Sequence, residues 1–188
     1  MKPTIGIALT GSFCTLGKTL AAMEVLKEHY TLIPIVSEHV ANTDTRFFRH
    51  DEVLQRIEAI CGSPPLQTLP EVEPIGPKKM LDLLVICPCT GNTLSKMALG
   101  ITDTCVTMAA KSHRRSGGKL LIALFTNDAL SGSAKSLGLL ADKKNVYFLP
   151  FRQDAPREKP ASLCSDLSLL PAAIKAALQG TQLQPVFL

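Results

Sequence analysis

The sequence of 188 residues is poor in aromatic side chains: it has no tryptophan, two tyrosines and seven phenylalanines. So few rings offer no platform on which the bases of single-stranded nucleic acid would stack. Positive charge is modest too, because 20 Lys and Arg against 16 Asp and Glu leave a formal net charge of +4, dispersed along the chain. We therefore expect no nucleic-acid partner, since proteins of that class gather basic residues on one face.

Long hydrophobic runs are also missing. No segment approaches the roughly 18 apolar residues of a membrane-spanning helix, and the first residues lack the apolar region and cleavage site of a signal peptide. The sequence thus predicts a cytoplasmic protein with no membrane partner, in which the six cysteines are reduced. Cys87 and Cys89 end an apolar run with no histidine nearby, so we interpret them as small buried side chains and expect no metal site.

The chain is 46% apolar and 19% charged, which excludes a disordered protein. Continuous apolar runs predict strands at residues 4–10, 31–37, 81–87, 119–125 and 145–149. Apolar residues at helical spacing predict helices at residues 15–29, 51–61, 92–99, 103–115, 129–140 and 167–178, and five prolines make residues 62–77 a shaped loop. Apolar strands that alternate with helices indicate a mainly parallel sheet covered on both faces. We therefore predict a three-layer α/β fold, flavodoxin-like or Rossmann-like, as a single domain over residues 1–188.

Polar segments follow three of the predicted strands, at residues 10–19, 37–46 and 88–93. Ligands of parallel α/β sheets bind outside the carboxyl ends of the strands, so these segments are candidates for a binding site. In the first of them, Gly11 and the Gly17-Lys18-Thr19 tripeptide suggest a triphosphate loop, but five residues separate the two glycines where that motif has four. Two interpretations stay open: amides and the hydroxyls of Ser12 and Thr15 hold one phosphate, or they cap a helix without a ligand.

The segment from Pro88 to Asp103, Pro-Cys-Thr-Gly-Asn-Thr-Leu-Ser-Lys-Met-Ala-Leu-Gly-Ile-Thr-Asp, is more specific. It resembles the Pro-Ala-Ser-Ala-Asn-Thr signature, with its Lys-small-small-Gly-x-x-Asp continuation, of flavin-binding decarboxylases that act on peptidyl or pantothenoyl cysteine. The matching residues are Pro88, Asn92, Thr93, Lys96, Gly100 and Asp103, with Thr90 in place of Ser and Gly91 in place of the second Ala. In that family the loop surrounds FMN.

The resemblance implies a set of cofactor-binding residues. The turn at Gly11 and Ser12, with Thr15, corresponds to the phosphate end of the flavin, and Ser37 corresponds to the position beside the isoalloxazine ring. The signature itself supplies the remaining members, which are Pro88, Thr90, Asn92, Thr93 and Asp103. We expect Gly11, Ser12 and Thr15 to form one anion site with Thr90 and Asn92.

Several further blocks resemble a second group, the B subunits of dipicolinate synthases from spore-forming bacteria. These blocks are residues 8–15, 43–47, 73–79, 88–103 and 126–130. They occur in the same order and at nearly the same spacing, and the likeness extends to residues 184–186. It implies a sporulation protein of the mother cell that, with the A subunit of dipicolinate synthase and NAD(P), oxidises a dihydrodipicolinate-level precursor to dipicolinate. It also implies a homo-oligomer and a small dicarboxylate substrate.

Two departures from the decarboxylases bear on chemistry. Where they carry a His-Ile-x-Leu segment, this chain has Pro74-Ile75-Gly76-Pro77, and proline offers neither an acid nor a base. Their substrate-clamping Pro-x-Met-Asn is replaced by residues 126–129, Thr-Asn-Asp-Ala, in which Asn127 is a candidate substrate ligand. We therefore expect no decarboxylation of cysteine-terminated substrates.

Three functions are consistent with these residues: a dehydrogenase subunit, a non-catalytic scaffold subunit with a vestigial flavin or phosphate pocket, and a cysteine decarboxylase, which the departures disfavour. The sequence assigns no catalytic residue. It also leaves open whether His39 or His50 reaches the pocket. Finally, it places His113, Arg114 and Arg115 with Lys111 and Lys119 in a basic cluster, which is either a solvated helix end or a contact for an acidic partner or a dicarboxylate.

Overall fold

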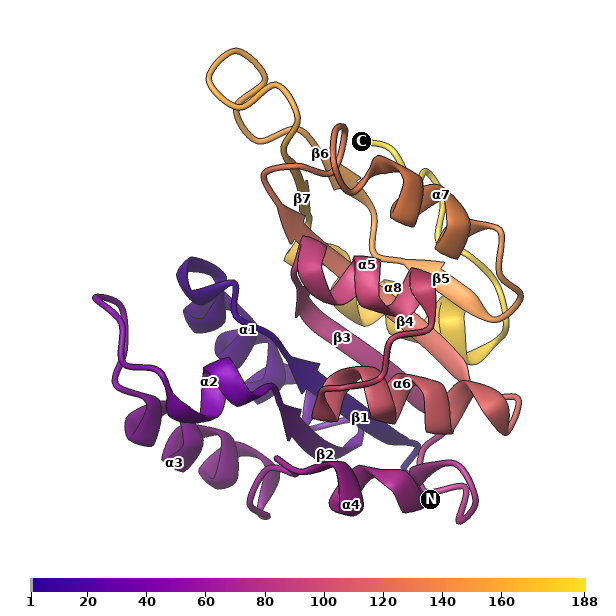
Figure 1. The fold of residues 1–188 in the computed structure, drawn as a ribbon. Helices are drawn as coiled ribbons and strands as arrows, with labels where there is room; N and C mark the ends of the chain where they lie inside the picture. Colours follow the sequence, from indigo (N-terminus) through magenta and orange to yellow (C-terminus); the bar gives the residue numbers. More distant parts are fainter. Residues whose placement is uncertain (1) are drawn as a thin grey trace.

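Five parallel strands in the order β2-β1-β3-β4-β5 form most of one seven-stranded sheet, and β7 and β6 extend it from β4 by antiparallel pairing (Figure 1). The structure, a computed structural model, describes residues 2–188. The strands are β1 Thr4–Leu9, β2 Thr31–Val36, β3 Leu83–Cys89, β4 Lys119–Thr126, β5 Val146–Phe148, β6 Phe151–Arg152 and β7 Leu163–Ser165. The order of the parallel strands is that of flavodoxin.

Helices cover both faces of this sheet, as the continuous apolar strands predict. They are α1 Phe13–Leu26, α2 Glu38–Asn42, α3 His50–Cys61, α4 Leu69–Val72, α5 Gly91–Leu99, α6 Cys105–Arg115, α7 Ala134–Ala141 and α8 Leu170–Leu178, with 3-10 turns η1 Glu73–Ile75 and η2 Leu167–Leu169. Within residues 2–188, none is long and apolar enough to cross a membrane. The predicted α/β class with a mainly parallel sheet is confirmed.

Two hydrophobic cores lie on opposite faces of the sheet. One packs α1, α3 and α8 against Ile5, Ile7 and Leu9 of β1, and the other packs α5, α6 and η1 against Leu84 and Ile86 of β3. Because side chains alternate between the faces of a strand, a strand that feeds both cores must be apolar at every position. This is why β3 is buried throughout.

The edge of the sheet at β2 explains a proline within a strand. Pro34 lacks an N–H donor, so it is tolerated only where no neighbouring strand needs one. Its carbonyl oxygen accepts a hydrogen bond from the amide of Leu66 at 2.9 Å, and Val36 donates to the carbonyl of Leu66 at 3.0 Å. The proline-rich segment thus covers the edge of the sheet at β2.

The structure corrects three parts of the sequence prediction. The polar segment after β2, for which no helix was predicted, contains α2, and the proline-rich segment, predicted as a loop, contains α4 and η1. The strand at residues 146–148 is not the last, since β6 and β7 follow it. Between these two strands, residues 153–162 project from the body of the molecule as an arm, which Figure 1 shows at the upper left.

Candidate functional site

A cavity of about 500 Å³ lies where β1, β2 and β3 end. Its position is the switch point of the sheet, where the chain crosses from the β2 side of β1 to the β3 side, and this is where parallel α/β sheets bind ligands. We call it the strand-end cavity; its lining residues are Thr10, Gly11, Phe13, Ser37, Glu38, His39, Thr90, Asn92, Thr93, Lys96, Asp103 and Thr104. Six of the ten binding residues proposed from the sequence are among them, namely Gly11, Ser37, Thr90, Asn92, Thr93 and Asp103.

Thr10, which the sequence analysis did not single out, ties the ends of β1 and β3 together. Its buried hydroxyl donates to the carbonyl of Pro88 at 2.7 Å and accepts from the amide of Thr90 at 3.0 Å. Its own amide donates to the same carbonyl at 3.2 Å. Pro88 itself does not line the cavity within the described chain, so its role there is to hold the turn that presents Thr90. Thr10 could have been identified from the sequence, because it is a hydroxyl residue directly after a buried strand.

The helix that follows β3 begins at the cavity. Thr90 caps α5 by accepting a hydrogen bond from the amide of Thr93 at 3.3 Å, and its hydroxyl lies 3.1 Å from that of Thr93. Asn92, in the first turn, is exposed and faces the cavity. Gly100 ends α5 in the left-handed conformation with φ of 74°, which is common for a glycine that follows a helix. The capping thus directs the amide of Asn92 toward any ligand that enters the cavity.

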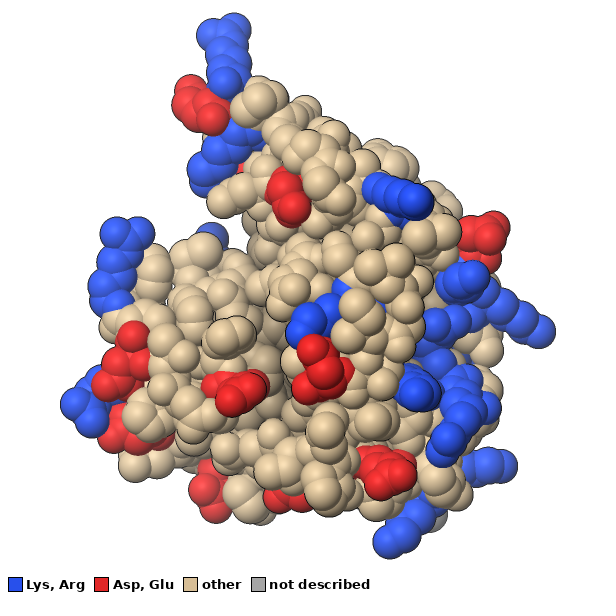
Figure 2. Space-filling view, in the orientation of Figure 1, with Lys and Arg blue, Asp and Glu red and all other residues tan. Residues whose placement is uncertain are grey.

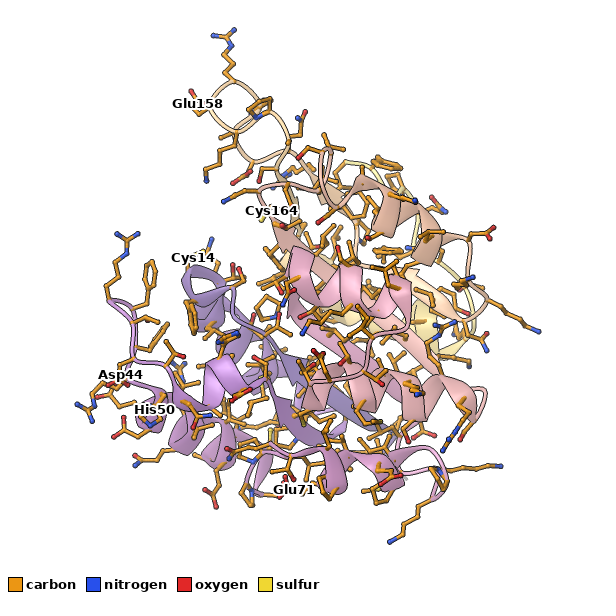
Figure 3. All side chains as sticks on the ribbon, in the orientation of Figure 1. Cys14, Asp44, His50, Glu71, Glu158 and Cys164 are labelled. Carbon is orange, nitrogen blue, oxygen red and sulfur yellow. The ribbon has the colours of Figure 1, made fainter. Side chains whose placement is uncertain are left out.

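On the opposite wall, Ser37 caps α2 by accepting from the amide of Val40 at 3.4 Å. Its hydroxyl hydrogen remains available to a ligand, because a hydroxyl both accepts and donates. His39 also lines the cavity, whereas His50 does not: its Nδ1 lies 2.7 Å from Asp44 Oδ1 at the start of α3 (Figure 3). The structure thereby separates the two histidines that the sequence left open.

One ion pair closes the side of the cavity. The ammonium of Lys96 lies 2.9 Å from both carboxylate oxygens of Asp103 and holds the pKa of that carboxyl below its usual range. Asp103 is therefore ionised at neutral pH, and its charge is balanced by a cation that also faces the cavity. A group of possible metal ligands lies away from this site, where one side-chain atom each of His50, Asp44 and Asp51 lies within 4.8 Å of the others. Both carboxylates already have protein partners, because Asp51 pairs with Arg49 and Asp44 accepts a hydrogen bond from the amide of His50.

The remaining candidates line a smaller pocket beside the first. Ser12, Thr15 and Asn127 border a pocket of about 140 Å³ between the start of α1, the end of β4 and β7. The hydroxyls of Ser12 and Thr15 lie 3.2 Å apart. Cys14 and Cys164 border the same pocket, and Figure 3 shows them on the same side of the molecule. The structure thus divides the predicted anion site between adjacent pockets, with Gly11 in the larger and Ser12 in the smaller.

The structure excludes the triphosphate loop. That motif needs Gly-Lys-Thr at the very start of a helix, with the threonine hydroxyl on a magnesium ion. Here α1 begins at Phe13, so Gly17 and Lys18 lie in its second turn. Thr19 is fully buried and its hydroxyl donates to the carbonyl of Thr15 at 3.3 Å.

The loop after β4, which stands where the decarboxylases have their clamp, is closed by its own side chains. Asp128 accepts hydrogen bonds from the hydroxyls of Thr126, at 2.5 Å, and Ser133, at 3.0 Å. A Cβ atom on Gly91 would lie only 2.7 Å from each of these three polar groups. Glycine in place of the second alanine of the signature is therefore what allows Asp128 to pack against the start of α5.

The Pro74–Pro77 segment lies on α6 and contributes no residue to the strand-end cavity in the described part of the chain. The amide of Gly76 donates to the hydroxyl of Ser112 at 3.0 Å, and that hydroxyl donates to the carbonyl of Glu73 at 2.6 Å. A Cβ atom on Gly76 would overlap the backbone carbonyl of Ser112. The segment that replaces the decarboxylase histidine therefore has a packing role in this chain.

His113 does not belong to the basic cluster in which the sequence placed it. Only 3% of its surface is exposed, and its Nε2 lies 3.0 Å from the carbonyl oxygen of Lys119. Burial lowers the pKa of this imidazole, so it is neutral at pH 7. Cys87 and Cys89 are buried as expected, and burial raises the pKa of Cys87 to about 12.

The fold and the strand-end cavity define a class of protein. Residues 1–152 match the family described as Flavoprotein, and the chain belongs to that family. It is 40% identical over 183 residues to the B subunit of dipicolinate synthase from Bacillus subtilis (strain 168), and the match covers 97% of this chain and 92% of that one.

Solved structures agree. The B subunit of dipicolinate synthase from Bacillus halodurans C superposes with a TM-score of 0.91 at 41% identity, covering 100% of this chain and 98% of that chain. The FMN-dependent cysteine decarboxylase SpaF superposes with a TM-score of 0.70 at 16% identity, covering 95% and 97%. The second likeness shows the shared flavodoxin-like fold.

Proposed function

We propose that this chain, folded as a single domain over residues 1–188, is the flavoprotein-type subunit of a dipicolinate synthase. With the A subunit of that enzyme it would oxidise a dihydrodipicolinate-level precursor to dipicolinate in the mother cell of a sporulating bacterium. The observation that carries the proposal is the 40% identity to the Bacillus subtilis relative along 97% of the chain, which includes every loop of the strand-end cavity.

We further propose that the strand-end cavity binds FMN. Its volume of about 500 Å³ lies within the range of roughly 300–1,000 Å³ that small-molecule sites occupy. The side chains suit a flavin: Asn92 has an amide donor and acceptor for ring or ribityl groups, and Ser37 has a hydroxyl hydrogen to donate. Lys96 supplies a cation. When bound, a flavin supplies redox chemistry at its ring.

The start of α1 is the best place for the phosphate. Its first-turn amides point out of the helix, Ser12 makes no side-chain cap to them, and helix N-termini attract anions through these amides and the helix dipole. Gly11 and Ser12 lie on either side of the boundary between the two pockets. A phosphate there would draw on residues of both, which is how the divided anion site can still serve one ligand.

Removal of two hydrogens from a dihydropyridine ring needs little acid–base catalysis by the protein. Formation of the aromatic ring favours the product, and the cofactor accepts the hydride, which is the difficult step. The protein must orient the ring and bind two carboxylates. We propose that NAD(P) is bound by the A subunit, since this chain has no Gly-x-Gly-x-x-Gly dinucleotide loop. Asn127, exposed at the smaller pocket, is our candidate for a substrate carboxylate.

Cysteine decarboxylation is the less favoured function. A general acid or base contributes about 10²–10⁴-fold in rate, and the segment that should supply it carries Pro74 and packs on α6. In the loop after β4, at the place of the decarboxylase clamp, Asp128 already accepts hydrogen bonds from the hydroxyls of Thr126 and Ser133.

The proposal is tested by purifying the chain alone and together with the A subunit, then adding precursor and nicotinamide cofactor and measuring dipicolinate. We expect formation only when both proteins are present. Robust dipicolinate production by the chain alone would contradict our placement of the chemistry. A visible spectrum of the purified chain tests the cofactor separately: flavin bands support FMN, while a colourless chain that still supports the A subunit would indicate a scaffold with a vestigial pocket.

We also propose that the chain forms a homo-oligomer. The strand-end cavity opens to solvent, and the projecting arm borders the smaller pocket next to it; Figure 2 shows the surface hollowed between the arm and the start of α1. A flavin ring in such an open site would be shielded from water by a neighbouring copy. Light scattering should give a multiple of the chain mass, and the mass of one chain in dilute solution would contradict this.

A further inference from the structure

A second cavity, of about 340 Å³, lies on the outer surface between α5, α6 and the start of β4. The connection from Gly100 to Thr104 separates it from the strand-end cavity, since Thr102 lines the second and Thr104 the first. We call it the α6 cavity; its lining residues are Met97, Gly100, Thr102, Thr107, Ala110, Lys111, Arg114, Arg115 and Leu120.

Three cations line one side of the α6 cavity. Lys111, Arg114 and Arg115 stand at positions i, i+3 and i+4 of α6, so they share one face of the helix. Among residues 2–188, no carboxylate forms an ion pair with any of them within 4.0 Å. Like charges at this spacing repel one another, and an anion held between them would remove that repulsion.

The position at the end of α6 explains part of this arrangement, because cations there complement the helix dipole. It does not explain the cavity. The dipole requires cations only near the last turn, whereas these three border a hollow whose apolar side is formed by the half-buried Met97, with the buried Ala110 and Leu120 behind it.

The charge of the surrounding surface also favours a negatively charged ligand. Figure 2 shows Lys and Arg side chains gathered at the right of the view, where α6 ends in Figure 1, while Asp and Glu are more numerous at the lower left near α3. A basic region of this kind raises the local concentration of anions. The cavity adds specific contacts to this general attraction. Guanidinium groups bind carboxylates through two parallel hydrogen bonds, and the apolar side can contact a carbon ring.

We propose that the α6 cavity binds a compact organic dianion of the dicarboxylate class, separately from the strand-end cavity. Arg114 and Arg115 hold the carboxylates, Lys111 adds charge, and Met97 contacts the carbon skeleton. A small ligand fits this feature better than a flat acidic protein surface, because the cations border one side of a concave volume. The proposed function enters only in the choice of probe, pyridine-2,6-dicarboxylate.

The test is calorimetric titration of the full chain with pyridine-2,6-dicarboxylate. We expect saturable binding that the double variant Arg114→Gln/Arg115→Gln weakens by about tenfold or more, as expected for the loss of charged hydrogen bonds. The matched control is Lys143→Gln/Lys144→Gln, which removes the same charge from the exposed turn after α7 and should leave the affinity unchanged. Pyridine-2-carboxylate should bind more weakly than the dicarboxylate, and inorganic phosphate tests whether any dianion suffices.

Three results would overturn the proposal. Equal weakening by both double variants would show nonspecific charge attraction. Loss of binding with Asn92→Ala but not with Arg114→Gln/Arg115→Gln would place the ligand in the strand-end cavity. Absence of small-anion binding, together with loss of association with the A subunit in the arginine variant, would make this face a protein interface. Binding in the α6 cavity by a chain that fails the dipicolinate assay would support this inference while contradicting the proposed function.

Discussion

Two parts of the molecule that face the same edge of the sheet are built differently. At the ends of β1, β2 and β3, polar side chains border an open cavity, and Ser37 and Thr90 each serve as helix cap and as cavity wall. At the loop after β4, the polar side chains bond to one another around Asp128 and pack on Gly91. The first arrangement leaves donors for a ligand, while the second uses the hydroxyls of Thr126 and Ser133 internally and leaves only Asn127 at the smaller pocket.

This difference indicates that a flavin-type site and a substrate-type site can change independently within one fold. Where the chain keeps the decarboxylase signature, side chains line a cavity. Where it departs, the Pro74–Pro77 segment packs on α6 through Gly76, and Thr126 and Asp128 pack against Gly91 of the signature. The comparison makes a general prediction: changes at the packed glycines should lower stability, and changes at the cavity should lower ligand affinity.

The largest effect is expected for Gly76→Ala. The new methyl group would overlap the carbonyl of Ser112 and lie 2.8 Å from the hydroxyl of Ser116, and a helix backbone cannot move aside as a side chain can. We expect a loss of roughly 3 kcal/mol of unfolding free energy, measured by urea denaturation. Gly138→Ala is the control: this glycine lies inside α7 with open space around it, so alanine should stabilise by about 0.5–1 kcal/mol.

Gly91→Ala should have a smaller effect, about 1–2 kcal/mol of destabilisation. Its methyl group would approach the side chains of Thr126, Asp128 and Ser133, which can shift, and alanine recovers some helix propensity. Combination with Asp128→Ala should restore part of the loss in the same denaturation assay. If Gly91→Ala alone is as stable as the wild type, the loop after β4 is not packed as described.

Acid should weaken the fold through His113. Burial lowers its pKa in the folded chain, while the unfolded imidazole titrates near about 6.5. The unfolded state then binds more protons below that pH, so the contribution of the neutral imidazole is complete above about pH 6.5 and is lost as the pH falls. We expect His113→Gln to flatten the pH dependence of the unfolding free energy in this range. The exposed His29→Gln control should retain the wild-type slope.

Paired asparagine variants separate the two pockets. Asn92→Ala should weaken FMN binding by about 3–10-fold, the usual value of one hydrogen bond, in a fluorescence titration. Asn127→Ala should leave FMN affinity unchanged and raise the KM for the dihydropyridine precursor in the assay that combines both proteins. The reverse pattern would place the flavin in the smaller pocket.

The smallest expected effect is that of Pro74→His on activity. Decarboxylation of a cysteine-terminated peptide with FMN present should remain undetectable, because position 74 belongs to η1 on α6 and the loop after β4 still carries the Asp128 hydrogen bonds. Detection of the decarboxylated product by mass spectrometry would show that the imidazole alone was missing.

Much of the fold follows from local patterns in the sequence. The strands at residues 83–89 and 119–126 are apolar throughout because both faces are covered, and α3 ends at Gly62, whose φ is 73°. The short helix α4 was missed, although its capping signal was present: Glu71 accepts hydrogen bonds from the amide and the hydroxyl of Thr68, each at 2.8 Å. The pattern Thr-x-x-Glu before an apolar residue is a known start signal, here hidden among prolines.

Other features had no local signal. The strands β6 and β7 have two and three residues, too few for any period to show, and they exist because Phe151 and Cys164 pair with partners elsewhere in the sheet. The sequence placed His113 in a basic cluster by adjacency, but the helix turns it inward to Lys119 while Arg114 faces out. Successive residues on a helix point about 100° apart, so neighbours in sequence need not share a surface.

The sequence by itself determined the α/β class, the parallel strands and the loops that carry the flavoprotein signature. These features are visible in local composition, because strands buried on two faces are apolar throughout and the loops at their ends are rich in glycine and hydroxyl residues. Only the tertiary structure decided which of those residues meet. It brought Gly11, Ser37 and Asn92 to one cavity, left Ser12 and Asn127 in another, and bonded the backbone of Glu73 and Gly76 to Ser112 of α6. The physical reason is that contacts between distant segments depend on strand order and helix orientation, which local composition does not encode.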